Sequence, residues 1–291
     1  MTSEKYRTLL EAVDAGSLSG AAQKLGYTPS AIVHIVNNLE HQLGFPILLR
    51  SNKGVTLTPD GERILPILRE IIRWEDQLNQ VSAEIQGMIV GDITIGSYFS
   101  IAANWLPDVI RRFRDDYPNV HINVLEGVHQ TLDKLLDEKR ADFCLYSYPP
   151  ADGCQWIPLK DDPMVAVVPI HHPMAKNDLF PIDEFTKEPF IMPAEGYDHD
   201  IMRVFSHHGI TPQVSYSTGE DHAAIAMIEA GLGIGLFNSL TTMHLNTTTV
   251  NIPLNPPEYA SMGVSFPESS KLSPAARRFI QYLKDYIKNF G

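Results

Sequence analysis

The feature that most constrains this chain is an apolar repeat with a period of seven residues between positions 64 and 88. One column recurs at every seventh residue, and a second follows it at an offset of three; together they comprise Ile64, Ile67, Ile71, Trp74, Leu78, Val81, Ile85 and Met88. Two such columns are typical of the a and d positions of a coiled coil. Because the repeat lasts more than three heptads, we favour pairing with a second copy over the alternative, an amphipathic helix packed on its own domain.

The same segment has a strong helix start. Thr58 offers a hydroxyl cap and Pro59 occupies the first helical position, where no N–H is needed. Asp60 and Glu62 complement the helix N-terminus, and Pro66 is expected to bend the helix. We therefore expect three parts: an N-terminal domain over residues 1–58, a linker and dimerisation helix over 59–88, and a C-terminal domain over 89–291.

Composition is that of an ordinary folded protein. The chain has 291 residues, of which 44% are hydrophobic and 20% charged, which suits two or more domains. No apolar run approaches about 18–20 residues, so no membrane span is expected. The acidic N-terminus lacks the pattern of a secretory signal, and two cysteines make a poor disulfide framework. A reducing cytoplasm is the expected location, and no cofactor is expected.

Short helices and one hairpin are predicted for the N-terminal domain. Ser17 and the Thr28-Pro29 pair supply helix caps, and Ala21-Ala22 are small enough to let two helices cross closely. This pattern is typical of a helix-turn-helix. Apolar runs on either side of turn residues then predict a hairpin or wing. The expected helices span residues 3–15, 18–25 and 29–43, and the hairpin spans 45–58.

Residues 17–61 resemble the DNA-binding signature of the LysR family of transcriptional regulators. The elements that match at the family's spacing are Ala21-Ala22, Leu25, Ser30-Ala31-Ile32, Leu39-Glu40, Leu43-Gly44, Arg50, Leu57-Thr58 and Gly61. The resemblance implies a winged helix-turn-helix that binds double-stranded operator DNA. It also implies a homodimer or a homotetramer, and dimers suit DNA reading because two recognition helices read two half-sites.

The reading surface departs from the family pattern. Val33-His34 stand where the family usually carries a Ser-Arg pair, and Asn37-Asn38 stand where it carries basic residues. Asparagine can contact adenine bidentately. The alternative is that both asparagines are solvated helix positions, since most protein–DNA hydrogen bonds go to the backbone. The expected base-facing residues are Pro29, Ser30, Val33, His34 and Asn37, with Asn38 in the same DNA-binding surface and Arg50 and Lys53 holding phosphates.

The net charge of −12 argues against nonspecific binding to nucleic acid but leaves room for a local site. Residues 1–90 hold eight Lys or Arg and ten Asp or Glu, a net charge of −2, so the remainder carries −10. The N-terminal part is therefore less acidic without being basic. Few cations predict a shallow salt dependence, because each neutralised phosphate contributes about −0.9 to the slope.

Strand-like and helical runs alternate beyond residue 91, which is typical of parallel α/β units. This region resembles the LysR effector domain, which is similar in fold to periplasmic solute-binding proteins. The matching pieces are residues 91–96, Leu106-Pro107, Phe113, Tyr117-Pro118, Ala141-Asp142, His172-Pro173 and residues 231–235.

The resemblance implies two subdomains, about 91–162 with 266–291 and about 163–265, joined by crossing strands near 146–148 and 263–266. The whole chain is thus expected to be a multidomain α+β protein: a winged helix-turn-helix, a long linker helix, and a two-subdomain α/β effector domain like the periplasmic binding proteins.

A small-molecule effector is expected in the cleft between these subdomains, at the carboxyl ends of strands. Residues 96–100 follow the first strand and open a helix, whose free N–H groups favour a carboxylate or phosphate, so an anionic effector is expected. Ser97 and Ser100 would donate hydroxyls, and Tyr98 or Phe99 would form an apolar wall; simple capping by either serine is the alternative. The family alignment adds His129, Tyr148, Gly196, Tyr197, Thr218 and Glu220.

Other chemistry has less support. The densest histidine set, His199, His207, His208 and His222 with Asp198 and Asp200, lacks the i, i+4 pair with a glutamate that marks a zinc protease. Adjacent His207 and His208 are not expected to face one metal from a helix. Cys144 is expected to be a buried small hydrophobe and Cys154 a loop residue, neither of them a redox sensor. No metal site and no catalytic set are expected.

Two functions follow from these observations. The first is a ligand-gated transcription factor and not an enzyme, with operator DNA, a small-molecule effector and further copies of itself as partners, RNA polymerase as a further candidate, and no membrane. The second is a small-molecule binding protein or enzyme that has kept a degenerate DNA domain. Its support is the near-neutral N-terminal charge and the substitutions at positions 33–34 and 37–38.

Overall fold

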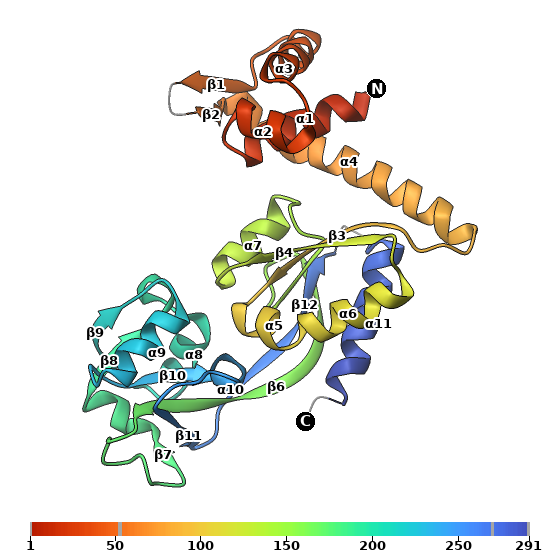
Figure 1. Ribbon diagram of the computed structural model, residues 1–291. Coiled ribbons are helices and arrows are strands. Elements are labelled where there is room, and N and C mark those ends of the chain that lie inside the picture. The colour runs from red at the N-terminus through yellow and green to blue at the C-terminus, as the bar shows by residue number, and fades with distance from the viewer. Residues whose placement is uncertain (1, 52–53, 269–270, 290–291) are drawn as a thin grey trace. The chain divides into compact units, whose positions relative to one another are not determined.

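The computed structural model describes residues 2–51, 54–268 and 271–289 (Figure 1). The chain divides into two compact units. One comprises Met1–Gly91 with Glu138–Arg140, and the other comprises Asp92–Asp137 with Ala141–Gly291. Each unit has its own core, as expected for separate domains. Among the described residues, no helix combines the length and apolar character needed to cross a membrane.

Three helices open the first unit: α1 (Thr2–Asp14), α2 (Leu18–Leu25) and α3 (Pro29–Leu43). The predicted caps form, because Ser17 Oγ accepts from Gly20 N and Thr28 Oγ1 accepts from Ala31 N, each at 3.2 Å. Gly26 ends α2 in the left-handed conformation that glycine adopts without strain. The helix-turn-helix predicted from the sequence is confirmed.

The hairpin follows as β1 (Leu48–Ser51) and β2 (Gly54–Leu57), which pair antiparallel. Glu40 of α3 fixes the start of the hairpin to this helix. Its Oε1 accepts hydrogen bonds from the backbone N–H groups of Ile47 (2.7 Å) and Leu48 (2.9 Å). Val55 N also donates to Gly16 O at 2.9 Å, which ties β2 to the α1–α2 turn. The wing is therefore fixed to the helices at both strands.

The core of this unit is made by the inward faces of all three helices and the start of the hairpin. Small residues stand where α2 crosses its neighbours, which permits close packing. Gly61 lies where a Cβ would come within 2.4 Å of Ile47 O, so the long helix that follows can approach the hairpin only at a glycine. The fully buried members are Leu9, Ala12, Ala21, Ala22, Ile32, Val36, Leu39, Ile47, Leu48 and Leu68.

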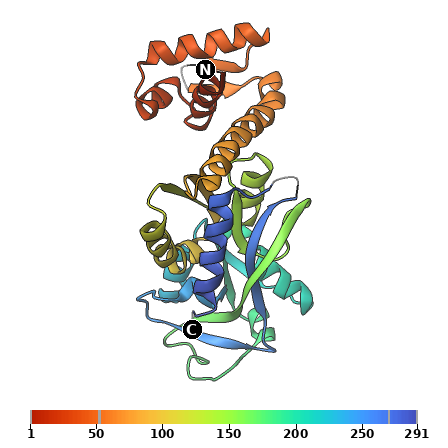
Figure 2. The same ribbon diagram turned by 90° about the vertical axis from the view of Figure 1, so that its right-hand side faces the viewer.

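The long helix α4 (Pro59–Ile85) is continuous through Pro66 (Figure 2). Thr58 Oγ1 caps it by accepting from Gly61 N at 2.9 Å, as predicted. The helix ends before Met88, so the expected extent of 59–88 is three residues too long. Gly87 adopts a positive φ of 81° directly after the last turn, and this ends the helix.

The first half of the second unit is built on β3 (Gly91–Ser97), β4 (Val120–Glu126) and β5 (Phe143–Ser147). β3 and β5 are parallel. Helices α5 (Phe99–Asn104), α6 (Leu106–Asp116), α7 (His129–Asp137) and α11 (Pro274–Ile287) complete this half. β5 is buried on both faces: Phe143 meets Phe279 of α11, while Cys144 and Tyr146 pack with the leucines of α7.

The second half contains β7 (Phe180–Pro181), β8 (Pro189–Met192), β9 (Gln213–Ser217), β10 (Gly235–Asn238) and β11 (Thr249–Asn255). Its helical segments are η1 (Ile182–Thr186), η2 (Ala194–Gly196), α8 (His199–His207), α9 (Asp221–Glu229) and α10 (Ser239–Thr242). α9 buries Ala224, Ile225 and Ile228 against strand residues Val165 and Val167. The parallel pair β8–β9 confirms the expected α/β character.

Two long strands connect the halves: β6 (Cys154–Pro169) and β12 (Tyr259–Pro267). The first part of β6 pairs with β12 and its last part pairs with β10 and β11, so one strand belongs to both halves (Figure 1). The expected crossing near 146–148 is wrong, because those residues end β5 and the crossing strand is β6. The sequence pattern missed this because only residues 164–169 of β6 form an apolar run.

Candidate functional site

The solvent face of α3 carries the residues expected to read DNA. Pro29, Ser30, His34, Asn37 and Asn38 are exposed, and Val33 is half-buried. Their polar groups already pair with each other: His34 Nε2 and Asn38 Nδ2 lie 3.1 Å apart, one helical turn from one another. The face therefore presents an ordered polar surface to solvent.

The wing contributes its arginine to this same surface. Arg50 of β1 donates to Asn37 Oδ1 at 2.6 Å, and its guanidinium lies 3.5 Å from Glu40 Oε2. Lys53, the other cation expected to hold phosphate, lies outside the described residues. The structure thus brings Asn37 and Arg50 together, although they were expected to contact different parts of DNA.

The apolar columns of α4 lie mainly on its solvent side. Gly61, Leu65, Leu68 and Ile72 form the buried face, whereas Ile64 and Val81 are half-buried. The most exposed side chains in the columns are Leu78 at 68% and Ile85 at 82%. The other exposed members are Ile67, Ile71, Trp74 and Met88, the last of them beyond the end of the helix.

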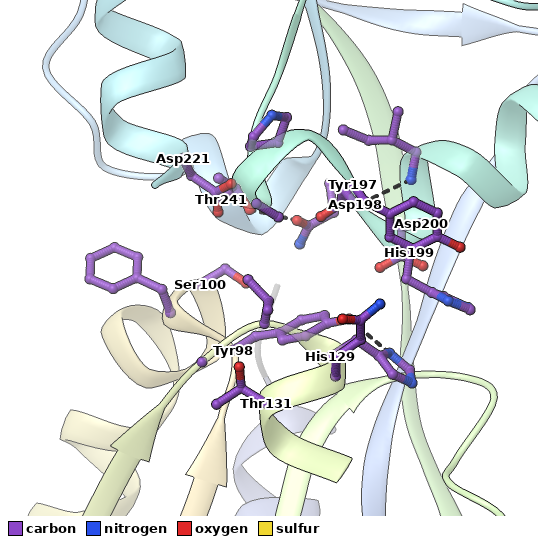
Figure 3. Close-up of a pocket in the computed structure, with 18 of the residues that line it drawn as sticks. Tyr98, Ser100, His129, Thr131, Tyr197, Asp198, His199, Asp200, Asp221 and Thr241 are labelled. Carbon is purple, nitrogen blue, oxygen red and sulfur yellow. Dashed lines mark hydrogen bonds between the residues drawn. The ribbon is translucent and has the colours of Figure 1, made fainter. Parts of the chain in front are cut away.

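A cavity of about 950 Å³ lies between the two halves of the second unit (Figure 3). One wall comes from the segment after β3, the N-terminus of α7 and the loop after β5. The other comes from the segment between β8 and α8, the start of α9, and the β10–α10 connection. This is the interlobe position at which ligands are expected to bind.

Six of the ten residues expected to bind an effector line this cavity: Tyr98, Phe99, Ser100, His129, Tyr197 and Glu220. The other four do not. Ser97 is buried and donates to Tyr98 O at 2.9 Å, and Thr218 donates to Glu220 O at 2.8 Å. Tyr148 is exposed and packs its ring 5.8 Å from Trp156, while Gly196 lies at the end of η2.

Tyr98 organises the floor of the cavity. Its hydroxyl hydrogen-bonds with His129 Nδ1 and with Ser147 Oγ, both at 3.1 Å. Burial and nearby carboxylates raise the pKa of the Tyr98 hydroxyl well above its ordinary value. Tyr98 is therefore a neutral hydroxyl that fixes α7 to the end of β5.

Two imidazoles stack across the cavity. The rings of His129 in α7 and His199 in α8 lie 4.4 Å apart between centroids, with an interplanar angle of 24°. Burial, and to a smaller extent His199, lowers the pKa of His129 to about 4. Burial also lowers the pKa of His199. Both rings are therefore neutral near pH 7 and can stack without charge repulsion.

Carboxyl groups dominate the charge of the cavity, and of these only Glu220 was expected there from the sequence. Asp198 Oδ1 caps α8 through Ile201 N at 3.0 Å, and Asp200 is buried beside it. Burial raises the pKa values of Asp200 and Asp221 to about 7, with Asp198 as a further cause in each case. The signal in the sequence was the acidic run around His199, which was considered only for metal binding.

The expectation of an anionic effector is not supported by this charge distribution. Helix α5 has six residues, so it supplies only a short dipole, and Tyr98 at its N-cap position makes no capping bond through its side chain. The described residues that line the cavity include seven carboxyl groups and neither lysine nor arginine. A bound anion would meet these carboxyl groups without a lysine or arginine among the described lining residues.

Hydrogen bonds join the halves beside the cavity. Asn104 Nδ2 donates to Ser100 O in its own helix at 2.8 Å and to Leu240 O of α10 at 3.0 Å. Asp162, on the crossing strand β6, accepts from Asn238 Nδ2, Ser239 Oγ and Leu240 N at 2.7–2.8 Å. The position of α10 is thus determined by both the crossing strand and the first half.

The histidine set considered for a metal separates into different places. His199 stacks on His129, and His222 packs edge-on against Phe99. His207 and His208 do converge, contrary to expectation: both rings hydrogen-bond to Glu258 Oε1, at 2.7 and 2.8 Å. They can do so because His208 lies one residue beyond α8, where helical geometry no longer directs its side chain.

Arg203 Nη1 occupies the other side of Glu258, at 3.4 Å from Oε2. The carboxylate is therefore already neutralised by a cation, which opposes the binding of a metal ion there. Cys144 is buried, as expected, and burial raises the pKa of its thiol. Cys154, expected in a loop, is instead the first residue of β6.

A capped helix-turn-helix with a wing, followed by a two-lobed domain around a cavity, defines a DNA-binding regulator with a ligand-binding domain. Two family models agree: "Bacterial regulatory helix-turn-helix protein, lysR family" matches residues 3–62, and "LysR substrate binding domain" matches residues 86–288. The chain belongs to the LysR family of transcriptional regulators.

Relatives and solved structures match this chain over all or most of its length. The uncharacterized HTH-type transcriptional regulator YvbU of Bacillus subtilis is 27% identical over 288 residues, 98% of each chain. HinK, a LysR family transcriptional regulator from Pseudomonas aeruginosa, shares the fold with a TM-score of 0.63 at 23% identity, over 99% of both chains. The effector binding domain of QuiR in complex with shikimate aligns with 69% of this chain and 98% of its own, with a TM-score of 0.61 at 20% identity.

Proposed function

We propose that this protein binds operator DNA through α3 and its wing, and that a small molecule in the interlobe cavity controls that binding. The observation that carries the proposal is the cavity of about 950 Å³ between two lobes joined by β6 and β12. A ligand that contacts both lobes binds one interlobe angle more tightly than others, and so shifts the population toward it. No chemical step is required.

The DNA-contacting set remains the one expected from the sequence, with one refinement. The exposed polar face of α3 supports contacts by Pro29, Ser30, Val33, His34, Asn37 and Asn38 in the major groove. Arg50 donates to Asn37 in the free protein, so contact with a phosphate requires that this bond be shared or exchanged.

Self-association through α4 is part of the proposal. The exposed apolar columns of this helix support pairing with a second copy, because contiguous exposed apolar side chains on a soluble protein mark interaction surfaces. Pairing would also present two recognition helices to two half-sites, which compensates for the few cations in each copy.

The test is a mobility shift of the full-length protein on DNA from its own upstream region at physiological salt. Binding that weakens at least tenfold in Asn37→Ala or His34→Ala, with unrelated DNA as the control, is the expected result. Tight ligand binding without any DNA binding would instead support the alternative, a binding protein or enzyme with a degenerate DNA domain.

Ser100→Ala tests the cavity separately. Ser100 is buried and lines the cavity, so the variant should lose or weaken the effector response while DNA binding persists. The measurement is operator binding with and without the effector. An unchanged response would remove Ser100 from the site.

A further inference from the structure

The interlobe cavity has the charge of a cation-binding site. Its carboxyl groups come from both lobes, and the described lining residues include no lysine or arginine; Arg203, which is not a lining residue, lies 3.9 Å from Asp200. In a partly enclosed site of low dielectric, such charges attract a cation far more strongly than they would in water. The seven are Glu126, Asp133, Asp152, Asp198, Asp200, Glu220 and Asp221.

One of these carboxyl groups is buried and has an oxygen without a hydrogen-bond donor, although Ser147 hydrogen-bonds to the same carboxyl group. Asp200 is 7% exposed, and its Oδ1 makes no hydrogen bond. The nearest cation, Arg203, has its Nε 3.9 Å from Oδ1, beyond hydrogen-bond distance. Buried acceptors are almost always paired in native proteins, so this oxygen calls for a donor brought by a ligand. Asp200 lines the cavity beside Asp198 (Figure 3).

Aromatic rings lie in the same cavity. Phe99 is 36% exposed and Tyr197 53% exposed, on opposite walls. The face of an aromatic ring attracts an ammonium or guanidinium group, and carboxylates bind the same groups through charge-assisted hydrogen bonds. The combination suits an organic cation, which has apolar carbon as well as charge, more closely than it suits a bare metal ion.

We propose that the effector of this regulator is a small organic cation with a protonated amine, which Asp200 and Asp198 bind and an aromatic wall covers. This inference rests on the proposed function, since it names the chemical class of ligand for that same cavity. Asp221, which opens α9 on the same lobe, supplies a third carboxyl group for a second amine or a hydroxyl.

Proton release should accompany binding. Burial and Asp198 raise the pKa of Asp200 to about 7, so near neutral pH this carboxyl is partly protonated in the free protein. An ammonium group bound against it favours the ionised form and expels the proton. Affinity should therefore increase from pH 6 to pH 8, and a carboxylate ligand would show the opposite trend.

The experiment is isothermal titration calorimetry of the full-length protein with benzylamine, putrescine and agmatine, and with benzoate and succinate as matched anions. Titration in two buffers of different ionisation enthalpy counts the protons released. We expect at least one amine to bind, with proton release, and to bind at least tenfold more weakly to Asp200→Asn and Asp198→Asn. Asp178→Asn, an exposed acid outside the cavity, is the matched control and should bind as the wild type does.

Three results would overturn the inference: no amine binds at 10 mM, only the carboxylates bind, or magnesium chloride alone binds with the same loss in Asp200→Asn. These results leave the proposed function intact if operator binding is retained. If the wild-type protein does not bind operator DNA, the proposed function is contradicted, whatever the calorimetry shows.

Discussion

At the scale of single residues, buried carboxyl groups in this protein play two opposite roles. Asp162 is fully satisfied: three donors from residues 238–240 hold it at the crossing strand. Asp200 is buried beside another carboxyl and lacks a donor on Oδ1. The first arrangement stabilises the fold. The second costs free energy because a buried oxygen lacks a hydrogen bond, and a ligand that donates one would remove that cost.

Asp162→Ala should destabilise the second unit by about 3 kcal/mol, because it leaves three donors, one buried and two half-buried, without their acceptor. Urea denaturation of the full chain, followed by tryptophan fluorescence, measures the change in the free energy of unfolding. The matched control is the neighbouring exposed residue in Asp161→Ala, for which we expect less than about 0.5 kcal/mol. Equal effects in the two variants would contradict the role given to Asp162.

Asp200→Asn should stabilise the ligand-free protein more at pH 8 than at pH 5. The folded state raises the pKa of this carboxyl from 3.8 to about 7, so it binds a proton that the unfolded state releases. The stability from that proton is present below about pH 4 and is lost as the pH rises through about 7. Other titrating groups, such as His129, are common to both proteins and cancel in the difference.

Thermal denaturation of both proteins across this pH range gives the measurement. The difference in Tm, variant minus wild type, should grow with pH, at about 2–4 °C for each kcal/mol in a chain of this size. A difference that is constant with pH would show that Asp200 does not titrate in this range.

Sequence reasoning located single residues best where a local rule applies. The caps at Ser17, Thr28 and Thr58 depend on a hydroxyl within three residues of a helix start, and all three form. The carboxyl cluster could not be found this way, because Asp133, Asp198 and Asp221 are far apart in the sequence and are brought to one cavity only by the fold. Their pKa values depend on how deeply the side chains are buried, and burial cannot be read from the sequence alone.

At the scale of elements, α4 has one face buried in its own unit and one face exposed to solvent. Leu65, Leu68 and Ile72 are buried in its own unit, whereas the heptad columns remain on the solvent side. The columns of the apolar repeat therefore do not form the face that packs on the helix's own unit, and pairing with a second copy stays a prediction for them. The heptad pattern did not indicate that the helix would end before Met88, because a repeat can continue past a glycine.

Leu78→Glu should weaken self-association at least tenfold, since it puts a charge into the centre of the exposed apolar column. Sedimentation equilibrium over a range of protein concentrations measures the dissociation constant. Asn79→Glu adds the same charge at the adjacent exposed position and should leave that constant unchanged. If both variants raise the dissociation constant equally, the added charge weakens self-association wherever it lies on the helix, and the apolar column is not the interface.

The crossing strands show where reasoning about elements fails. β6 is sixteen residues long, but its first part is polar on one face and carries Lys160, Asp161 and Asp162, so only its end has the apolar pattern of a strand. Its continuity arises from pairing with β12 and then with β10 and β11. Long-range pairing of this kind has no local signal.

At the scale of the whole molecule, the overall order of parts was predictable and the ligand was not. The winged helix-turn-helix, long helix and two-lobed domain follow from repeats and motifs that span the chain, and the family models match the same regions. The sign of the effector charge was inferred from one helix start. The cavity contains carboxyl groups from several distant segments, and these support the cationic effector proposed above.

The salt dependence of operator binding should be shallow for a regulator. The first ninety residues carry a net charge of −2, and Arg50 is the wing cation within the described residues. We expect the slope of log K against log salt to be no steeper than about −8, since each phosphate contact contributes about −0.9. Mobility shifts at several salt concentrations measure it. A steeper slope would require cations that this surface does not present.

The bond between Asn37 and Arg50 joins two tasks that most descriptions of DNA recognition keep apart. If Asn37 reads a base and Arg50 holds the backbone, a substitution at position 37 also releases the guanidinium beside it. A single substitution would then change both the sequence specificity and the affinity of DNA binding. In a regulator with this pair, a substitution at position 37 that changes the operator sequence would then need a second substitution in the wing to restore the affinity for DNA.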